Sequence, residues 1–150
     1  MINETSSGAI LFYINKQTIV FLLLHYSGGH WDFPKGNQEK GESDMDTALR
    51  EITEETGIID VTFLEGFKKE IFYKYKRNNH LISKKVVYFL AKSNSPDVVL
   101  SSEHLEFVWE SYEDALRRIT YKNSKEILTE GYNFLINFLK SNNQSSNLIR

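Results

Sequence analysis

The chain has 150 residues and a mass of 17.5 kDa, the usual size of one compact domain. Hydrophobic residues make up 41% and charged residues 25%, as in an average soluble globular protein, which argues against wholesale disorder. The net charge of −2 excludes a strongly basic protein that coats nucleic acid. The absence of cysteine excludes disulfides, thiolate metal sites and cysteine nucleophiles.

The sequence shows no segment that would direct the chain into or across a membrane. Residues 1–8 are polar and lack a basic stretch followed by an apolar one, so no signal peptide is indicated. The longest apolar run, Ile19 to Leu24, is too short to span a bilayer. Because a cysteine-free chain also suits a reducing compartment, we expect a cytoplasmic protein with no membrane partner.

The first third of the chain predicts a hairpin followed by loops. The β-type runs 9–14 and 19–25 are separated by the turn-forming residues 15–18, and the second run has the apolar character of a strand buried on both faces. Residues 31–34 (WDFP) predict a short extended segment that ends at the proline, with its two aromatic residues in the core. The glycine-rich, charged stretch 36–42 predicts another loop.

The strongest helix signal covers residues 43–56. Ser43 with Asp46 three residues later has the form of a capping box, and Gly57 stands where a helix-terminating glycine belongs. Apolar side chains recur at i, i+3, i+4 and i+7 and predict one buried stripe, which consists of Met45, Ala48, Leu49 and Ile52.

The rest of the chain predicts further strands and two helices. Strands are expected at 61–64, 70–75, 86–91 and 107–109. A short helix is expected at 111–119 and a longer one at 124–139. The inner side of the longer helix would carry Ile127, Leu128, Phe134, Leu135 and Phe138.

These elements predict a single domain of the α/β (α+β) class. A mixed β-sheet flanked by helices is the arrangement that buries both the strands and the helix stripes. Residues 1–140 would form this domain. Residues 141–150 are polar and would form a flexible tail.

Three carboxylates cluster on one face of the helix predicted at 43–56. Glu51, Glu54 and Glu55 stand at i, i+3 and i+4, about a quarter to a third of a turn from the apolar stripe. Such a cluster repels itself, and a hard divalent cation such as Mg²⁺ or Mn²⁺ relieves the repulsion through all-oxygen ligation. Because these ions neutralise phosphate oxygens, the cluster favours phosphoryl or pyrophosphoryl chemistry, with Arg50 orienting a carboxylate. The alternative is a solvated acidic helix face.

A longer pattern decides between these two interpretations. Gly36, five residues, Glu42, seven residues and then 50–58 (REITEETGI) complete the pattern G-x5-E-x7-R-E-U-x-E-E-x-G-U, in which U is aliphatic. By this pattern the sequence resembles the Nudix hydrolases. The resemblance implies a Nudix-type α/β/α sandwich and hydrolysis of a nucleoside diphosphate linked to a further group, by water attack at phosphorus.

The resemblance also implies roles for the residues of this box. The metal ligands would be Glu51, Glu54 and Glu55, joined by the backbone carbonyl of Gly36. Glu42 and Arg50 would support the loop and the helix, and they belong with Glu54 and Glu55 to the catalytic set.

Segments outside the box resemble one branch of the family, the asymmetrical diadenosine tetraphosphate hydrolases of the animal and archaeal type. The segments are FLLL at 21–24, HW at 30–31, PKG at 34–36, EGFK at 65–68, VVYFLA at 86–91 and SEH at 102–104. The resemblance extends over about residues 8–139. It implies a small nucleotide as substrate and no stable nucleic-acid partner.

The same resemblance implies roles for five residues outside the box. Glu103 would complete the metal site. His30 and Lys35 would donate to phosphate oxygens. Tyr73 and Tyr121 would stack against an adenine. The structural alternatives are an exposed loop acid, a histidine bonded to the backbone and tyrosines packed in the core.

Basic residues gather in the middle of the chain despite its acidic total. They are Lys68, Lys69, Lys74, Lys76, Arg77, Lys84 and Lys85. We interpret them as a rim that steers a polyphosphate, with lysines that protect sheet edges as the alternative. The stretch 76–83 predicts a loop that is longer than in the family.

Other Nudix reactions suit the same box. RNA 5′-pyrophosphohydrolysis is the nearest alternative, because a 5′-triphosphate end resembles a dinucleoside polyphosphate, and hydrolysis of oxidised nucleotides is also open. ADP-ribose hydrolysis is less favoured, because that group carries a proline soon after the box and the only later proline here is Pro96. A binding module without catalysis is disfavoured, because all the box carboxylates are present. The general base, the number of metal ions and the oligomeric state stay open.

Overall fold

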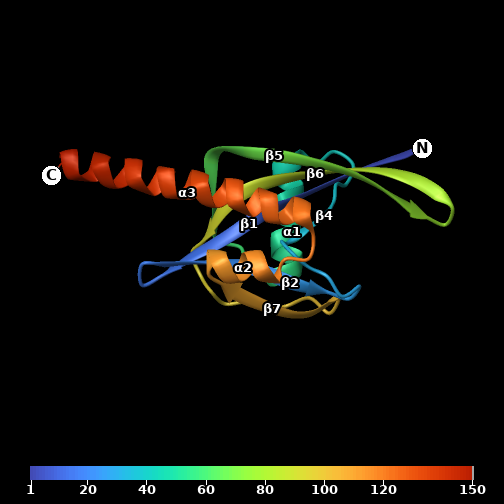
Figure 1. Ribbon diagram of the computed structural model, residues 1–150, viewed down its shortest axis with the longest axis horizontal. Helices are drawn as coiled ribbons and strands as arrows, with labels where there is room; N and C mark the ends of the chain where they lie inside the picture. Colours follow the sequence, from blue (N-terminus) through green and yellow to red (C-terminus); the bar gives the residue numbers. More distant parts are fainter. Residues whose placement is uncertain (150) are drawn as a thin grey trace.

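The protein is built on one mixed sheet of seven strands (Figure 1). The computed structural model describes the backbone of residues 1–149 and the side chains of residues 1–142. The strands are β1 (Ile2–Asn15), β2 (Thr18–Tyr26), β3 (Trp31–Asp32), β4 (Lys35–Asn37), β5 (Val61–Arg77), β6 (His80–Ser93) and β7 (His104–Glu110). The helices are α1 (Asp44–Thr56), α2 (Tyr112–Arg118) and α3 (Lys122–Ile149). The strand order is β3-β2-β1-β6-β5, and β4 pairs with β1 while β7 pairs with β2.

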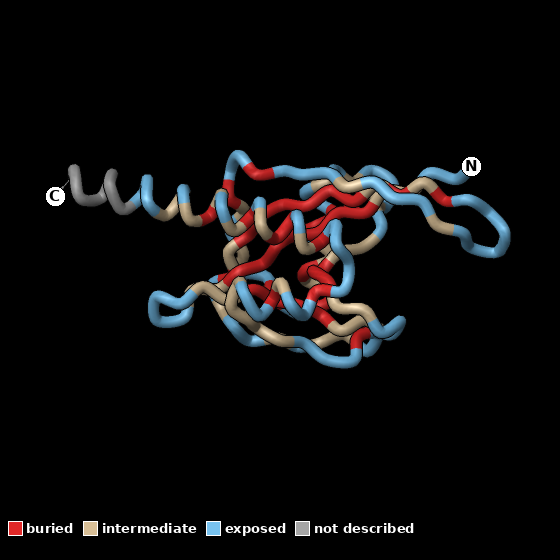
Figure 2. Tube along the Cα trace, in the orientation of Figure 1, coloured by how far each residue is buried: buried red, intermediate tan, exposed pale blue. Residues whose placement is uncertain are grey.

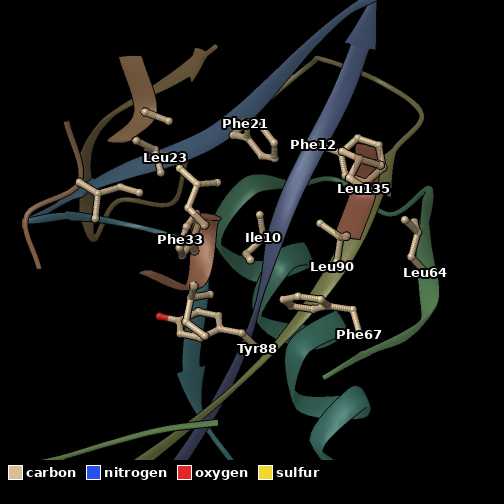
Figure 3. Close-up of a cluster of buried hydrophobic side chains, with 14 of the residues drawn as sticks. Ile10, Phe12, Phe21, Leu23, Phe33, Leu64, Phe67, Tyr88, Leu90 and Leu135 are labelled. Carbon is tan, nitrogen blue, oxygen red and sulfur yellow. The ribbon is translucent and has the colours of Figure 1, made fainter. Parts of the chain in front are cut away.

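Helices cover both faces of this sheet. Successive side chains of a strand point to opposite faces, and β1 supplies both cores in this way. Ile10 and Phe12 pack in the cluster that α2 and α3 cover, which Figure 3 shows. Ala9 and Leu11 pack in the cluster that α1 covers. The expected α/β/α sandwich is confirmed, and so is the second strand that is buried on both faces, because residues 21–24 are all inaccessible to solvent.

The first strand is longer than the sequence predicts. β1 begins at Ile2, whereas the apolar pattern indicates a strand only from Ala9. Residues 2–12 pair in parallel with β6, and residues 6–8 pair on the other side with β4. Ser6 and Ser7 are buried in this stretch. Backbone hydrogen bonds to two neighbours, rather than apolar side chains, therefore hold it in the sheet.

β5 and β6 form one long hairpin that projects from the sheet, and its tip is exposed (Figures 1 and 2). The strands predicted at 61–64 and 70–75 are both parts of β5, which pairs with β6 on either side of an irregularity between Phe63 and Lys68. Because polar residues lie between the two apolar runs, the sequence pattern indicated two separate strands.

The prediction of a loop over residues 76–83 is wrong, because a turn of only two residues connects β5 to β6. Asn78 and Asn79 have positive φ values of 53° and 65° between the paired residues Arg77 and His80. Two positive φ values are what a tight hairpin turn requires, and asparagine tolerates them well. Residues 76–83 therefore belong to two paired strands and a tight turn instead of a loop.

Part of the basic charge of this hairpin is paired with acidic side chains. Arg77 Nη2 lies 2.8 Å and Lys84 Nζ 3.5 Å from the carboxylate of Glu4. Lys85 Nζ lies 3.5 Å from Glu70. The basic rim that would steer a polyphosphate stays a prediction. Its uncompensated positive charge is smaller than its number of basic residues indicates.

The helix predicted at 43–56 is confirmed, but its buried face is not the expected one. Ser43 caps α1 and forms the capping box with Asp46, and Gly57 ends the helix at a φ of 73°. Met45 and Leu49 are 45% and 40% exposed, contrary to the predicted stripe. The buried residues are Thr47, Ala48, Ile52, Glu55 and Thr56. The helix is thus rotated so that Glu55 enters the interior, which apolar periodicity alone could not show.

The two C-terminal helices agree with prediction in their packing. Ser111 caps α2, and Ile127, Leu128 and Leu135 of α3 are buried. α3 continues in helical form to Ile149, past the predicted end at 139. Side chains 143–150 and the backbone of residue 150 lie outside the described part, so the flexible tail and the domain boundary at 140 stay predictions. No helix within residues 1–149 is long and apolar enough to cross a bilayer.

The close approach of β1 and β4 predicts that Gly8 tolerates no side chain. A Cβ at Gly8 would overlap the carbonyl oxygen of Pro34 and the Cβ of Lys35. We expect Gly8→Ala to lower the free energy of unfolding by about 1–3 kcal/mol, the usual cost of overpacking, as measured by urea titration. Gly28→Ala is the matched control, because its Cβ would make only an ordinary 3.5 Å contact with the ring of His30. Equal losses in the two variants would contradict the prediction.

Candidate active site

Arg50 ties the loop before α1 to the helix. Its Nε donates to Oε2 of Glu42 at 2.6 Å, and its Nη2 donates to Oε1 of Glu42 at 3.0 Å and to the carbonyl of Asn37 at 2.9 Å. Glu42 also accepts the backbone N–H of Glu39 and the hydroxyl of Thr47. These hydrogen bonds, that of Arg50 above all, lower the pKa of Glu42 to about 2. Glu42 and Arg50 are thus a structural clamp that closes the loop on α1.

The same guanidinium reaches two of the predicted metal ligands. Nη1 of Arg50 donates to Glu51 at 2.8 Å and to Glu54 at 3.2 Å. The carboxylate of Glu51 lies so close to the α-carbon of Gly36 that a Cβ there would overlap it. Burial raises the pKa of Glu51, and the charges of Glu54 and Glu42 add to the rise. Glu54 is the exposed member of the group.

Glu55 is the most buried carboxylate of the box. Its Oε1 accepts the backbone N–H of Lys35 at 3.0 Å, and its Oε2 lies 3.4 Å from Nε2 of His104. Burial, followed by the charges of Glu51 and Glu103, raises the pKa of Glu55 to about 8. Burial also lowers the pKa of His104, so its ring is neutral at pH 7 and the contact is not an ion pair.

The loop before β7 brings Glu103 to the box. Ser101 N–H donates to the backbone carbonyl of Glu55, and Val99 N–H donates to that of Thr56. Ser101 in turn accepts the N–H of Glu103 through its hydroxyl. The loop is therefore fastened to the end of α1, and the exposed carboxylate of Glu103 is close enough to raise the pKa of Glu55.

The carboxylates suit a hard divalent cation by their chemistry. All candidate donors are oxygen atoms, and the pKa of Glu51 and of Glu55 is raised partly by neighbouring negative charge, which a cation would offset. Among the described side chains, no three acidic or histidine residues are arranged so that they could hold a metal ion together. Arg50 occupies one oxygen each of Glu51 and Glu54. Joint ligation therefore requires these side chains to turn.

All four predicted substrate-binding residues line a cavity of about 600 Å³, which is linked to the carboxylates through Lys35 and its hydrogen bond to Glu55. They are His30, Lys35, Tyr73 and Tyr121. The ring of His30 stacks on Tyr26 with centroids 4.7 Å apart and lies 5.4 Å from Tyr121. Burial and the charge of Lys35 lower the pKa of His30, so the ring is neutral at pH 7. The volume is in the range of small-molecule sites.

Tyr73 and Tyr121 are not core residues. Tyr73 is 37% and Tyr121 51% exposed, and both residues form part of the cavity wall. The core alternative for these two tyrosines is therefore wrong. Their stacking against a base stays a prediction.

The sequence analysis gave no role inside the cavity or the box loop to several residues of this region, although it named Lys84 in the basic rim. Asp32, Tyr88 and Ser124 line the cavity and are almost fully buried. Lys84 is also buried and donates to the side chain of Asn37 at 2.6 Å, next to Gly36 in the box loop. One signal was available, since an acid between two core aromatics, as in Trp31-Asp32-Phe33, is unusual in a buried strand. The other three depend on tertiary contacts.

Comparisons with known proteins agree with this geometry. A family model described as the NUDIX domain matches residues 4–130. The chain is 41% identical over 128 residues to the mouse protein named bis(5′-nucleosyl)-tetraphosphatase [asymmetrical], covering 81% of this chain and 84% of the mouse protein. A crystal structure of a Caenorhabditis elegans Ap4A hydrolase binary complex has a TM-score of 0.81 at 33% identity, covering 89% of this chain and 98% of that one.

A further relative is the mRNA-decapping protein g5R of African swine fever virus. It is 34% identical over 126 residues, which cover 73% of this chain but only 49% of the viral protein. Nudix hydrolases generally need a divalent metal, in keeping with the oxygen donors of the site. The match over residues 4–130, together with the complete box on α1 and its preceding loop, shows that the chain belongs to the Nudix hydrolase family.

Proposed function

We propose that this Nudix hydrolase cleaves diadenosine tetraphosphate asymmetrically to ATP and AMP. The observation that carries the proposal is the position of Lys35. Its backbone N–H donates to Glu55 of the box, while its side chain lines the aromatic cavity. A nucleoside in the cavity would therefore extend its phosphates toward the carboxylates. Relatives that carry the name of this activity and cover most of the chain support the same substrate.

The metal would be Mg²⁺ or Mn²⁺. Its proposed ligands are the carbonyl oxygen of Gly36 and the carboxylates of Glu51, Glu54, Glu55 and Glu103. Carboxylate and carbonyl oxygens are the ligands that these ions prefer. When bound, such an ion activates a water molecule and neutralises charge on the pyrophosphate oxygens.

The remaining residues would position the substrate and the ligands. Arg50, held by Glu42, would hold Glu51 and Glu54 near the metal until their side chains turn toward it, which makes Arg50 and Glu42 positioning residues. Lys35 and the neutral ring of His30 would donate to phosphate oxygens. The rings of Tyr73 and Tyr121 would stack on an adenine, which contributes about 1–3 kcal/mol per base.

The substrate assignment predicts the products of hydrolysis. The purified protein, incubated with diadenosine tetraphosphate and Mg²⁺, should release ATP and AMP, measured by ion-exchange chromatography. EDTA should abolish the reaction. Release of two ADP molecules would contradict the asymmetrical cleavage. Release of pyrophosphate from triphosphorylated RNA, without turnover of the dinucleotide, would replace this proposal by RNA 5′-pyrophosphohydrolysis.

The exposed ligand Glu54 predicts a variant that separates catalysis from binding. Glu54→Gln removes one negative charge from a solvent-facing side chain, so the fold should be kept. We expect kcat to fall roughly 100-fold or more, the scale on which removal of one electrostatic stabiliser acts. Affinity for diadenosine tetraphosphate, measured by calorimetry, should change little. Glu113→Gln, on the exposed start of α2, is the matched control. Unchanged kcat in Glu54→Gln would contradict an enzymatic role of the cluster.

The raised pKa of Glu55 predicts how stability depends on pH in metal-free protein. The folded pKa of about 8 lies above the ordinary value of 4.5, so folding favours the protonated carboxyl. This contribution is complete below pH 4.5 and is lost as the pH rises through 8. In EDTA, the Tm of the wild type should therefore fall between pH 5 and pH 8.5 relative to that of Glu55→Gln. The same pH dependence in both proteins would show that Glu55 is not the group responsible.

A further inference from the structure

The cavity has a polar end that the proposed function does not use. Asp32 of β3, Tyr88 of β6 and Ser124 of α3 line it and are only 3%, 0% and 2% exposed. Aromatic and aliphatic side chains, such as Ile71 and Val86, form much of the remaining wall. Buried polar groups cost free energy unless they have partners. Three of them together in a cavity of ligand size indicate a place for polar atoms of a ligand.

The hydroxyl of Tyr88 has the hydroxyl of Ser124 beside it but, among the described residues, no partner in hydrogen-bonding geometry. It makes no hydrogen bond within the described part of the chain, although it is shielded from solvent. Figure 3 shows this hydroxyl pointing out of the hydrophobic cluster, away from Phe67. Unpaired buried hydroxyls are rare in folded proteins. This one indicates that the polar end of the cavity is completed by something other than the chain itself.

The carboxyl group of Asp32 is held in a fixed orientation. Its Oδ1 accepts the backbone N–H of Phe33 at 2.9 Å, and the hydroxyl of Ser124 lies beside the same group. The strand that carries it is fastened to the connection between α2 and α3, because Trp31 and Thr120 exchange two hydrogen bonds. A carboxylate has about four acceptor positions. Asp32 therefore keeps acceptor capacity for a ligand.

Asp32 lies next to the rings that are proposed to hold the base. Its negative charge contributes to the raised pKa of Tyr73, which reaches about 12 mainly through burial. The negative charge of Asp32 also favours the protonated ring of His30, which lines the same cavity. Burial raises the pKa of Asp32, and the charge of Lys35 offsets part of this rise. A base stacked on Tyr73 would thus have its edge within the field of this carboxyl group.

We propose that Asp32 selects the base of the substrate, by accepting an N–H of the exocyclic amine of adenine. This inference rests on the proposed function, because it assumes that the cavity holds the base of a nucleotide. Hypoxanthine and guanine carry a carbonyl oxygen where adenine carries the amine. That carbonyl oxygen is itself an acceptor. Opposite the acceptor oxygen of Asp32, it would leave both groups without a hydrogen-bond donor. Stacking alone makes no such distinction, since every base has a π-face.

The competing explanation is a structural role for Asp32 at the start of α3. An acidic side chain near a helix N-terminus stabilises the helix, and Ser124 belongs to its first turn. Such a role would change the stability of the protein and leave its choice of base untouched. Measurements of base preference and of Tm on the same variants therefore separate the two explanations.

The test is calorimetric binding of AMP, IMP and GMP in the presence of Mg²⁺. None of the three has a phosphoanhydride bond, so binding is measured without turnover. The wild type should bind AMP about 10- to 100-fold more tightly than IMP or GMP, the ratio expected for one hydrogen bond to a charged group. In Asp32→Asn, the amide oxygen still accepts the N–H of Phe33. The amide nitrogen then stands where the second carboxylate oxygen was, so a donor replaces an acceptor. The preference should then reverse toward IMP.

The control and the outcomes keep the inference separate from the proposed function. Asp97→Asn makes the same change on an exposed loop outside the cavity and should keep the wild-type ratios. Equal affinities of the wild type for the three nucleotides, or no binding of any, would overturn the role of Asp32 even if Asp32→Asn failed to fold. An unchanged preference in Asp32→Asn with a lower Tm would leave only the structural role. If AMP is preferred but diadenosine tetraphosphate is not cleaved, the inference stands and the proposed reaction is wrong.

Discussion

The site depends on one guanidinium group among acidic side chains. Arg50 contacts Glu39, Glu42, Glu51 and Glu54 at distances of 2.6 to 3.6 Å. Single ion pairs on a protein surface contribute little, but the Arg50 side chain is only 22% exposed and donates hydrogen bonds to Glu42, Glu51 and Glu54. Such a network holds its members more firmly than isolated pairs would. The loop that carries Gly36 and the helix that carries the carboxylates are thereby kept in one arrangement.

Within this arrangement, carboxylates of the same type acquire opposite properties. The pKa of Glu42 falls to about 2, because Arg50, Thr47 and a backbone N–H all bond its ionised form. The pKa of Glu55 rises to about 8, because it is buried beside other negative charges. Environments that push paired pKa values apart are characteristic of functional sites. Glu42, whose charge Arg50 compensates, therefore anchors the loop, and Glu55, which lies beside other negative charges, is suited to a cation.

The sequence predicted those parts of the site that are encoded locally. Glu42, Arg50 and the three glutamates of α1 follow from the spacing of a single loop and helix, and the structure joins all of them except Glu55 in one network. Periodicity failed on the same helix, because Glu55 shares the buried face with Ala48 and Ile52, whereas Leu49 is 40% exposed. A carboxylate on the buried face gives no hydrophobic signal, so patterning could not show that this position is buried.

The sequence by itself determined the family, the sheet-and-helix class and the cluster of carboxylates, because each rests on short-range spacing or on strong apolar runs. Only the tertiary structure decided which buried polar residues join the four predicted ones around the cavity. Asp32, Tyr88 and Ser124 come from a strand, another strand and a helix that are up to 92 positions apart in the chain (32 to 124). The polar start of β1 was also a tertiary outcome, since its place in the sheet comes from backbone pairing with β4 and β6. Pairing between distant backbones and burial of single polar side chains leave no periodic mark in a sequence, because both depend on partners that only the folded chain brings together.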